Sequence, residues 1–131
     1  MEQNNAIQEA DRYIQNARQI LSEKAGKDGD YYTDKKYIRM AGHTAWHGVL
    51  IALDATLKVK ENLKKGQRPD IKDYQSAISK VDKKMLRALM NSYETLHIVL
   101  GYDGNRRFPI VQDGLKEAQE IIDWASRRIN Q

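Results

Sequence analysis

The histidines are the first candidates for chemistry, because His43 and His47 lie four residues apart in the segment HTAWH. A helix places residues i and i+4 on one face, so the two imidazoles could bind one metal ion. Glu94 and His97 form an E-x-x-H pair, the spacing found in carboxylate-bridged di-metal bundles. Those sites need two such pairs, and the sequence contains only this one. We therefore predict no metal site and no cofactor, and interpret the histidines as half-buried residues with polar partners.

No pattern of catalytic residues accompanies them. The sequence contains no G-x-S-x-G, no G-x-x-x-x-G-K and no H-E-x-x-H, and the absence of cysteine excludes thiolate chemistry and disulfides. We assign no catalytic residue. A metal-dependent helical enzyme that uses His43, His47 and Glu94 is kept as one alternative.

A second set of polar residues is expected at the end of the molecule where the loops 26–33 and 101–108 meet. We interpret these residues as packing of the two loops against the bundle. The alternative is a pocket for a small ligand, because tyrosines with a few charged side chains can build one. At about 1.5 Å rise per residue, His97 should lie level with Ile38 rather than His43. Arg39 and Glu94 should form an ion pair. The candidate pocket residues are Tyr37, Arg39, His43, Tyr93, Glu94 and His97.

Apolar spacing predicts the elements that position these residues. Apolar residues recur every three to four positions over about 4–24, 34–64, 70–100 and 109–130. Turns that contain glycine or proline separate these segments. Helices joined by short connections pack against their sequence neighbours in opposite directions. The sequence therefore predicts an all-α protein, an antiparallel up-down four-helix bundle, with residues 1–131 as a single domain.

The second predicted helix is unusual, because nearly its whole circumference between Ala41 and Leu57 is unsuited to water. A helix in a bundle needs only one apolar stripe, so a second subunit is expected to cover the remainder. Aromatic side chains dominate interface cores, which makes a tryptophan the expected anchor. We predict a homodimer whose interface contains Trp46, Val49, Leu50 and Leu53.

Bulk composition narrows the class of protein. With 131 residues, 40% hydrophobic content and a net charge of +4, the chain can bury one core and carries a mild basic excess. No run approaches the 18 or more apolar residues of a membrane span, and the start lacks a secretory pattern. We expect a cytoplasmic protein with no membrane partner. Lysines around residues 58–72 could contact phosphates, but solvated helix ends explain them as well.

Three segments resemble HEPN domains: the alanine-rich first helix, YIRMAGHTAWHGVLIALDATLK and GLKEAQEIIDWASRRI. The likeness covers roughly residues 4–130 and consists of helical patterning. Many HEPN proteins are ribonucleases with an arginine followed four to six residues later by a histidine, near the start of the last long helix. Here that region reads NRRFPIVQDG, with Arg106 and Arg107 but no histidine. The chain is also similar to small uncharacterised bacterial helical-bundle proteins.

Our first interpretation is a non-catalytic interaction module that self-associates through the second helix. The resemblance implies the alternative, an RNA-binding or nucleotide-binding protein or ribonuclease that contacts nucleic acid through Arg106 and Arg107. It also implies a possible nucleotidyltransferase-like partner.

Overall fold

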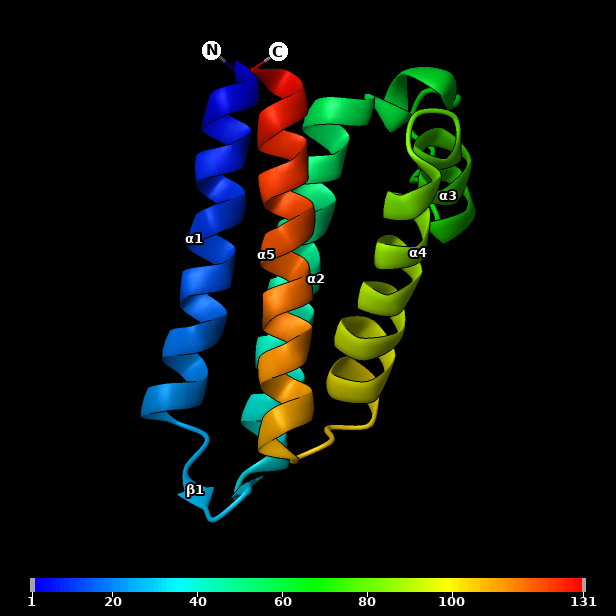
Figure 1. Cartoon of the computed structure of the whole chain (residues 1–131). Coiled ribbons are helices and arrows are strands. Elements are labelled where there is room, and N and C mark those ends of the chain that lie inside the picture. Colours follow the sequence, from blue (N-terminus) through cyan, green and yellow to red (C-terminus); the bar gives the residue numbers. More distant parts are fainter. Residues whose placement is uncertain (1, 131) are drawn as a thin grey trace.

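Two long helices, α1 (Glu2–Glu23) and α2 (Lys35–Leu57), form the first half of the molecule in a computed structural model that describes residues 2–130. A small antiparallel hairpin of β1 (Lys27–Asp28) and β2 (Tyr31–Tyr32) joins them. Asp34 caps α2, because its carboxylate accepts a hydrogen bond from the backbone N–H of Lys36. Figure 1 shows this hairpin at one end of the molecule and both chain termini at the other.

The second half contains a 3₁₀ turn (Val59–Asn62), α3 (Ile71–Ser79), α4 (Lys83–Ser92), a π-helix (Tyr93–Tyr102) and α5 (Phe108–Ile129). In Figure 1, α5 runs beside α1 with α2 behind it, and α4 lies on the far side of α2 and α5 from α1. The all-α prediction is confirmed apart from the tiny hairpin. The structure has five α-helices within residues 2–130, however, where the sequence predicted four.

Two predicted helices end earlier than expected. The helix predicted over 34–64 ends at Leu57, because Lys58 adopts a left-handed conformation with φ of 52° and its N–H closes on the Asp54 carbonyl. The helix predicted over 70–100 is interrupted after Ser79. There Asp82 starts a new helix by accepting a hydrogen bond from the N–H of Met85 at 3.1 Å.

Small residues allow α1 and α2 to pack closely. A Cβ atom on Gly48 would lie 3.0 Å from the Ala10 carbonyl oxygen and 3.0 Å from the Tyr13 Cβ, tighter than most real contacts. Ala10, Ala45 and Ala52 are fully buried. The small-residue face of α2 is therefore covered by α1 of the same chain. No helix within residues 2–130 is long and apolar enough to cross a membrane.

Candidate functional site

Two histidines and three aromatic rings meet where α2 packs against the π-helix. The ring centroid of His43 lies 5.6 Å from that of His97, and Tyr102 lies 5.8 and 5.1 Å from the two. The Tyr93 ring lies 5.2 Å from His97, and the buried Trp46 ring lies 5.5 Å from Tyr93. We call these five residues the histidine cluster.

Two glycines bring the helices close enough for this contact. A Cβ on Gly42 would lie 2.7 Å from the Leu96 carbonyl oxygen, and one on Gly101 would lie 2.7 Å from Cε1 of His43. Real Cβ atoms do not come so near to other atoms. The prediction that His97 lies far from His43 is therefore wrong. The π-helix ends about two turns further along α2 than equal helix ends would place it.

His97 favours its neutral form. Burial lowers its pKa below the ordinary value, and the nearby charge of His43 lowers it further. Its Nδ1 atom is buried, and no protein group within residues 2–130 accepts or donates a hydrogen bond there. The two imidazoles thus differ: His43 is exposed at the surface and His97 is half-buried against aromatic rings.

Basic side chains lie next to the cluster, at the hairpin end of the molecule. A shallow cavity of about 310 Å³ is lined by Lys35, Arg106 and Arg107 together with Tyr31 and the loop 103–105. Asp103, in that loop, is the one carboxylate among the lining residues. A Cβ on Gly104 would meet the side chains of both Lys35 and Arg39. We call the four cations Lys35, Arg39, Arg106 and Arg107 with Tyr31 and Tyr102 the basic surface.

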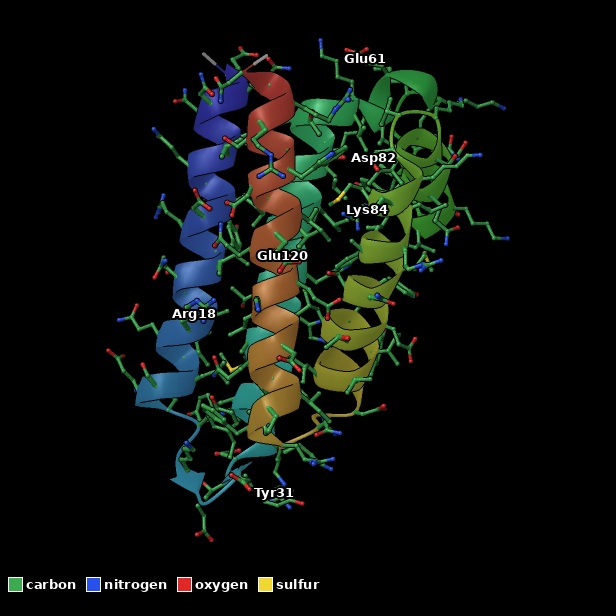
Figure 2. The ribbon with its side chains drawn as sticks, viewed as in Figure 1. Arg18, Tyr31, Glu61, Asp82, Lys84 and Glu120 are labelled. Atoms are coloured by element: carbon green, nitrogen blue, oxygen red, sulfur yellow. The ribbon has the colours of Figure 1, made fainter. Side chains whose placement is uncertain are left out.

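Backbone hydrogen bonds hold the arginine loop against the hairpin. The N–H of Tyr32 donates to the Arg106 carbonyl at 2.8 Å, and the N–H of Phe108 donates to the Asp30 carbonyl at 2.7 Å. The Asn105 side chain accepts a hydrogen bond from the backbone N–H of Arg107 at 2.9 Å. These bonds fix the loop backbone, so the arginine side chains project from a set position. Figure 2 labels Tyr31 at this end.

The structure brings together four of the six predicted pocket residues. Tyr93, His97 and His43 lie in the histidine cluster, and Arg39 lies one turn before His43 on α2. Tyr37 instead packs against the core. The expected ion pair between Arg39 and Glu94 is wrong, because neither side chain has an ion-pair partner within the described residues.

His43 and His47 do not share a site. The His47 ring lies 5.0 Å from Tyr13 on α1, whereas His43 faces the π-helix. Residues 2–130 contain no group of three histidine or carboxylate side chains that could hold a metal ion. The helix spacing that suggested a metal site therefore directs these two rings to different neighbours.

The predicted interface residues lie mainly in the interior. Val49 and Leu53 are 0% exposed, Trp46 is 7% exposed and Leu50 is half-buried. This corrects the expected anchor of a second subunit, because the π-helix covers Trp46 and α1 covers the small residues of α2. The apolar circumference of the helix is thus satisfied largely within one chain, and self-association through these side chains loses its support.

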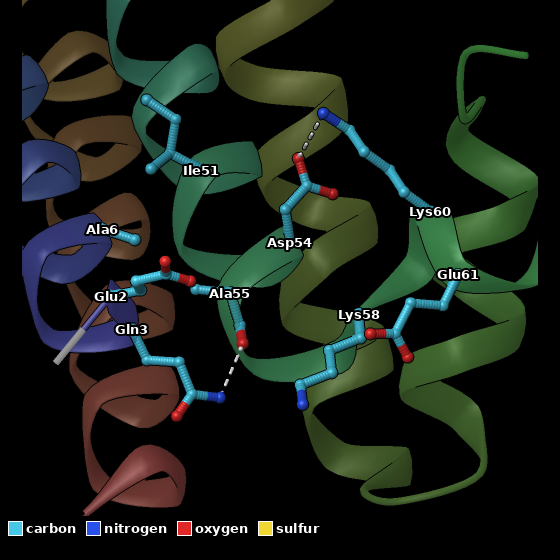
Figure 3. Close-up of a pocket in the computed structure, with 9 residues that line it drawn as sticks. All are labelled: Glu2, Gln3, Ala6, Ile51, Asp54, Ala55, Lys58, Lys60 and Glu61. Atoms are coloured by element: carbon cyan, nitrogen blue, oxygen red, sulfur yellow. Dashed lines mark hydrogen bonds and ion pairs between the residues drawn. The ribbon is translucent and has the colours of Figure 1, made fainter. Parts of the chain in front are cut away.

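A separate groove lies at the opposite end, between the start of α1 and the end of α2 (Figure 3). The Gln3 side chain donates a hydrogen bond to the Ala55 carbonyl at 3.1 Å, and Lys60 lies 4.0 Å from Asp54. Burial raises the pKa of Asp54, while hydrogen bonding from Tyr74 and the charge of Lys60 act in the other direction. The groove is lined by carboxylates and by ammonium groups, so neither sign of charge dominates it.

Sequence reasoning missed Lys35 as part of the site and did not connect the two arginines with the tyrosines. The spacing of Lys35, Arg39 and His43 at i, i+4 and i+8 was the available signal, because it places all three on one helix face. The position of Arg106 and Arg107 beside that face could not be read in the same way, since it depends on where the loop lies.

Comparison with known proteins gives a family without an assigned activity. The model of a family described as a domain of unknown function (DUF5618) matches residues 5–127. A solved structure, of a protein of unknown function from Dyadobacter fermentans, is 40% identical and has a TM-score of 0.88. That likeness covers 98% of this chain and 99% of that chain. No curated protein matches the chain.

Proposed function

The chain belongs to the DUF5618 family, and we propose that it binds single-stranded RNA through the basic surface. The observation that carries the proposal is the convergence of four cations from α2 and the loop 103–107 beside exposed tyrosines. Lysine and arginine side chains neutralise phosphates, and this electrostatic contact supplies most of sequence-independent affinity.

Exposed aromatic rings support single strands rather than a duplex. Tyr102 is 61% exposed and Tyr31 is 50% exposed, so both can offer a ring face to an unpaired base. Stacking of a base on such a ring contributes about 1–3 kcal/mol and tolerates any base. A basic surface flanked by such rings fits a strand whose bases are free to turn outward.

The proposed scaffold keeps part of the earlier fold prediction. We take α1, α2, α4 with the π-helix, and α5 as an antiparallel four-helix bundle, with α3 as an added segment. The resemblance of α2 and α5 to HEPN helices supports RNA as the ligand. In this scaffold, the closed packing of α2 leaves its hairpin end, rather than its middle, as the interaction surface.

Fluorescence anisotropy with a labelled oligouridine tests the proposal. We expect salt-sensitive binding that weakens when Arg39 and Arg106 are replaced by alanine. The matched control replaces Lys64 and Lys65, two exposed lysines at the opposite end, and should bind as the unmodified protein does. Equal weakening in both double variants would show that net charge alone drives binding, and the proposal would be wrong.

RNA cleavage is a second candidate, favoured by the His43–His97 pair. The imidazoles lie 5.6 Å apart beside the cations, which supply the charge that a scissile phosphate needs. One imidazole would take the proton from a ribose 2′-hydroxyl as that oxygen attacks phosphorus. The other would protonate the departing 5′-oxygen, leaving a 2′,3′-cyclic phosphate. The lowered pKa of His97 suits it to the base role.

This second candidate has its own test. An oligouridine should be cut by the unmodified protein and resist cutting when every sugar lacks its 2′-hydroxyl. His43→Ala should abolish cutting while leaving binding in place. Cutting of the deoxy strand, or persistence in the His43 variant, would exclude the two-histidine mechanism without affecting the binding proposal.

A further inference from the structure

Another cavity lies on the other side of the hairpin, between the end of α1 and the start of α5. Its volume is about 320 Å³, near the lower limit for small-molecule pockets. The side chains of Tyr32, Phe108, Leu21 and Leu115 form its apolar part. None of these residues belongs to the basic surface, so a ligand bound here is independent of the proposed RNA binding.

Two cations line this cavity without a carboxylate partner. Arg18 and Lys27 are among its lining residues, none of the lining residues is acidic, and neither cation forms an ion pair within residues 2–130. The Lys27 ammonium lies 3.7 Å from the centroid of the Phe108 ring. Figure 2 labels Arg18 on the part of α1 nearer the hairpin. The cavity therefore combines apolar walls with uncompensated positive charge, which attracts anions.

Fixed polar groups add directionality. Gln112 donates a hydrogen bond from Nε2 to the Tyr32 hydroxyl oxygen at 2.9 Å, which leaves the hydroxyl proton free to donate elsewhere. Tyr32 is 5% exposed, and its ring lies 5.6 Å from that of Phe108. Burial raises the pKa of Tyr32, so its hydroxyl stays protonated at neutral pH, and Arg18 is close enough to act on it by charge.

We propose that this cavity binds a small aromatic acid, a planar ring that carries one carboxylate. The ring would lie against Tyr32 and Phe108, and the carboxylate would face Arg18, Lys27 and the Tyr32 hydroxyl. The planar guanidinium of Arg18 can grip both carboxylate oxygens. The small volume selects a single ring, and the absence of lining carboxylates disfavours ligands that also carry an amine.

Benzoate is the probe, with its uncharged counterpart benzamide for comparison. Amide NMR spectra of the whole chain should show chemical-shift changes at Gly26, Lys27 and Gln112 at benzoate concentrations below about 20 mM. Benzamide should bind at least about tenfold more weakly, because it lacks the charge-assisted contacts. Equal binding of the two compounds, or no shift at these residues, would overturn the proposal.

Variants assign the binding to the cavity. Arg18→Gln and Lys27→Gln should each raise the dissociation constant for benzoate about tenfold or more. Lys24→Gln, a neighbouring exposed lysine that does not line the cavity, should leave it unchanged. If Lys24→Gln weakens binding as much as the other two, the contact is non-specific and the assignment is wrong.

Competition between benzoate and inorganic phosphate is the last test. A benzoate site with an apolar wall should release its ligand only at phosphate concentrations well above those of benzoate. If phosphate displaces benzoate at equal concentration, the cavity recognises a phosphoryl group and not an aromatic acid. The Arg18 and Lys27 variants should still bind oligouridine, because neither residue belongs to the basic surface. This control separates the benzoate result from the proposed RNA function.

Discussion

The indole N–H of Trp124 donates a hydrogen bond to Oδ2 of Asp82 at 3.1 Å, while Oδ1 of the same carboxylate caps α4. One side chain therefore starts a helix and joins it to α5. Trp124 is 8% exposed, so its N–H has little access to water as an alternative partner. This contact ties the second half of the chain together at the point where the predicted long helix is interrupted.

Removing that carboxylate should destabilise the protein strongly. Asp82→Ala deletes an N-cap and leaves a buried indole donor unpaired, so we expect a loss of about 2–3 kcal/mol in the free energy of unfolding. Urea denaturation followed by circular dichroism measures it. Asp73→Ala removes an exposed capping contact at the start of α3 and should cost only about 1 kcal/mol. Equal losses would mean that the Trp124 contact contributes nothing.

The close approach of α2 and the π-helix should be sensitive to a single methyl group. Gly42→Ala places a Cβ against the Leu96 carbonyl and the Gly101 N–H, so we expect a loss of about 1–3 kcal/mol. Gln8→Ala on the exposed face of α1 serves as the control and should change stability by less than about 0.5 kcal/mol. An unchanged thermal midpoint for Gly42→Ala would show that the helices can separate freely.

His97 should make stability fall under mild acid. Its pKa is lower in the folded chain than in the unfolded chain, so its contribution is present above the ordinary value of 6.5. That contribution is lost as pH falls through the folded pKa. We expect the free energy of unfolding to decline between about pH 7 and pH 5, and His97→Phe to reduce this decline. Denaturation at several pH values checks it, and parallel curves would contradict the assignment.

Tyr74 should control the acidity of Asp54. Its hydroxyl donates a hydrogen bond to Asp54 Oδ1 at 2.8 Å, which lowers a pKa that burial raises. Tyr74→Phe should therefore raise the pKa of Asp54 further and destabilise the protein at neutral pH by about 1–3 kcal/mol. Carbon NMR of the carboxyl group measures the first effect. An unchanged pKa would show that the bond has no influence on the charged form.

The basic surface should give a defined salt dependence. If its four cations each neutralise one phosphate, the logarithm of affinity should fall with the logarithm of salt at a slope of roughly −3. Arg39→Ala and Arg106→Ala should each reduce that slope by about 0.7. Tyr102→Leu should weaken binding by about 1–3 kcal/mol without changing the slope, because stacking involves no counterion release.

If Tyr102→Leu changes the salt slope but not the affinity, the ring positions the charged side chains and does not stack on a base. Tyr37→Leu is the matched control, because Tyr37 packs against the core instead of joining the exposed rings. It should leave oligouridine binding intact.

Local patterns were sufficient for much of the fold. The three-to-four spacing located α1 and α5 to within a few residues of their ends. The apolar rhythm across 70–100 was equally regular, but Val81 lies at the break and is 46% exposed. Two shorter helices can continue one apolar stripe, so periodicity alone does not distinguish them from a single helix.

The sequence predicted some residues of the candidate site but not their arrangement. Arg39, His43 and His97 were identified by type, but the separation of the two histidines was estimated from helix rise and aligned ends. The π-helix and the glycine contact between Gly42 and Gly101 invalidate that estimate. Trp46 was assigned to a subunit interface for a similar reason, because one helix does not reveal how much of its surface its neighbours cover.

Sequence by itself determined that this chain is helical, which residues are apolar and where most turns fall, because these depend on interactions over a few residues. Tertiary structure alone decided which rings meet, which cations share a surface and that both tryptophans are enclosed. Those relationships join segments far apart in the sequence, such as Tyr32 and Phe108. Offsets between packed helices, set by glycines and by the start of a helix at Asp82, move every side chain relative to its partners.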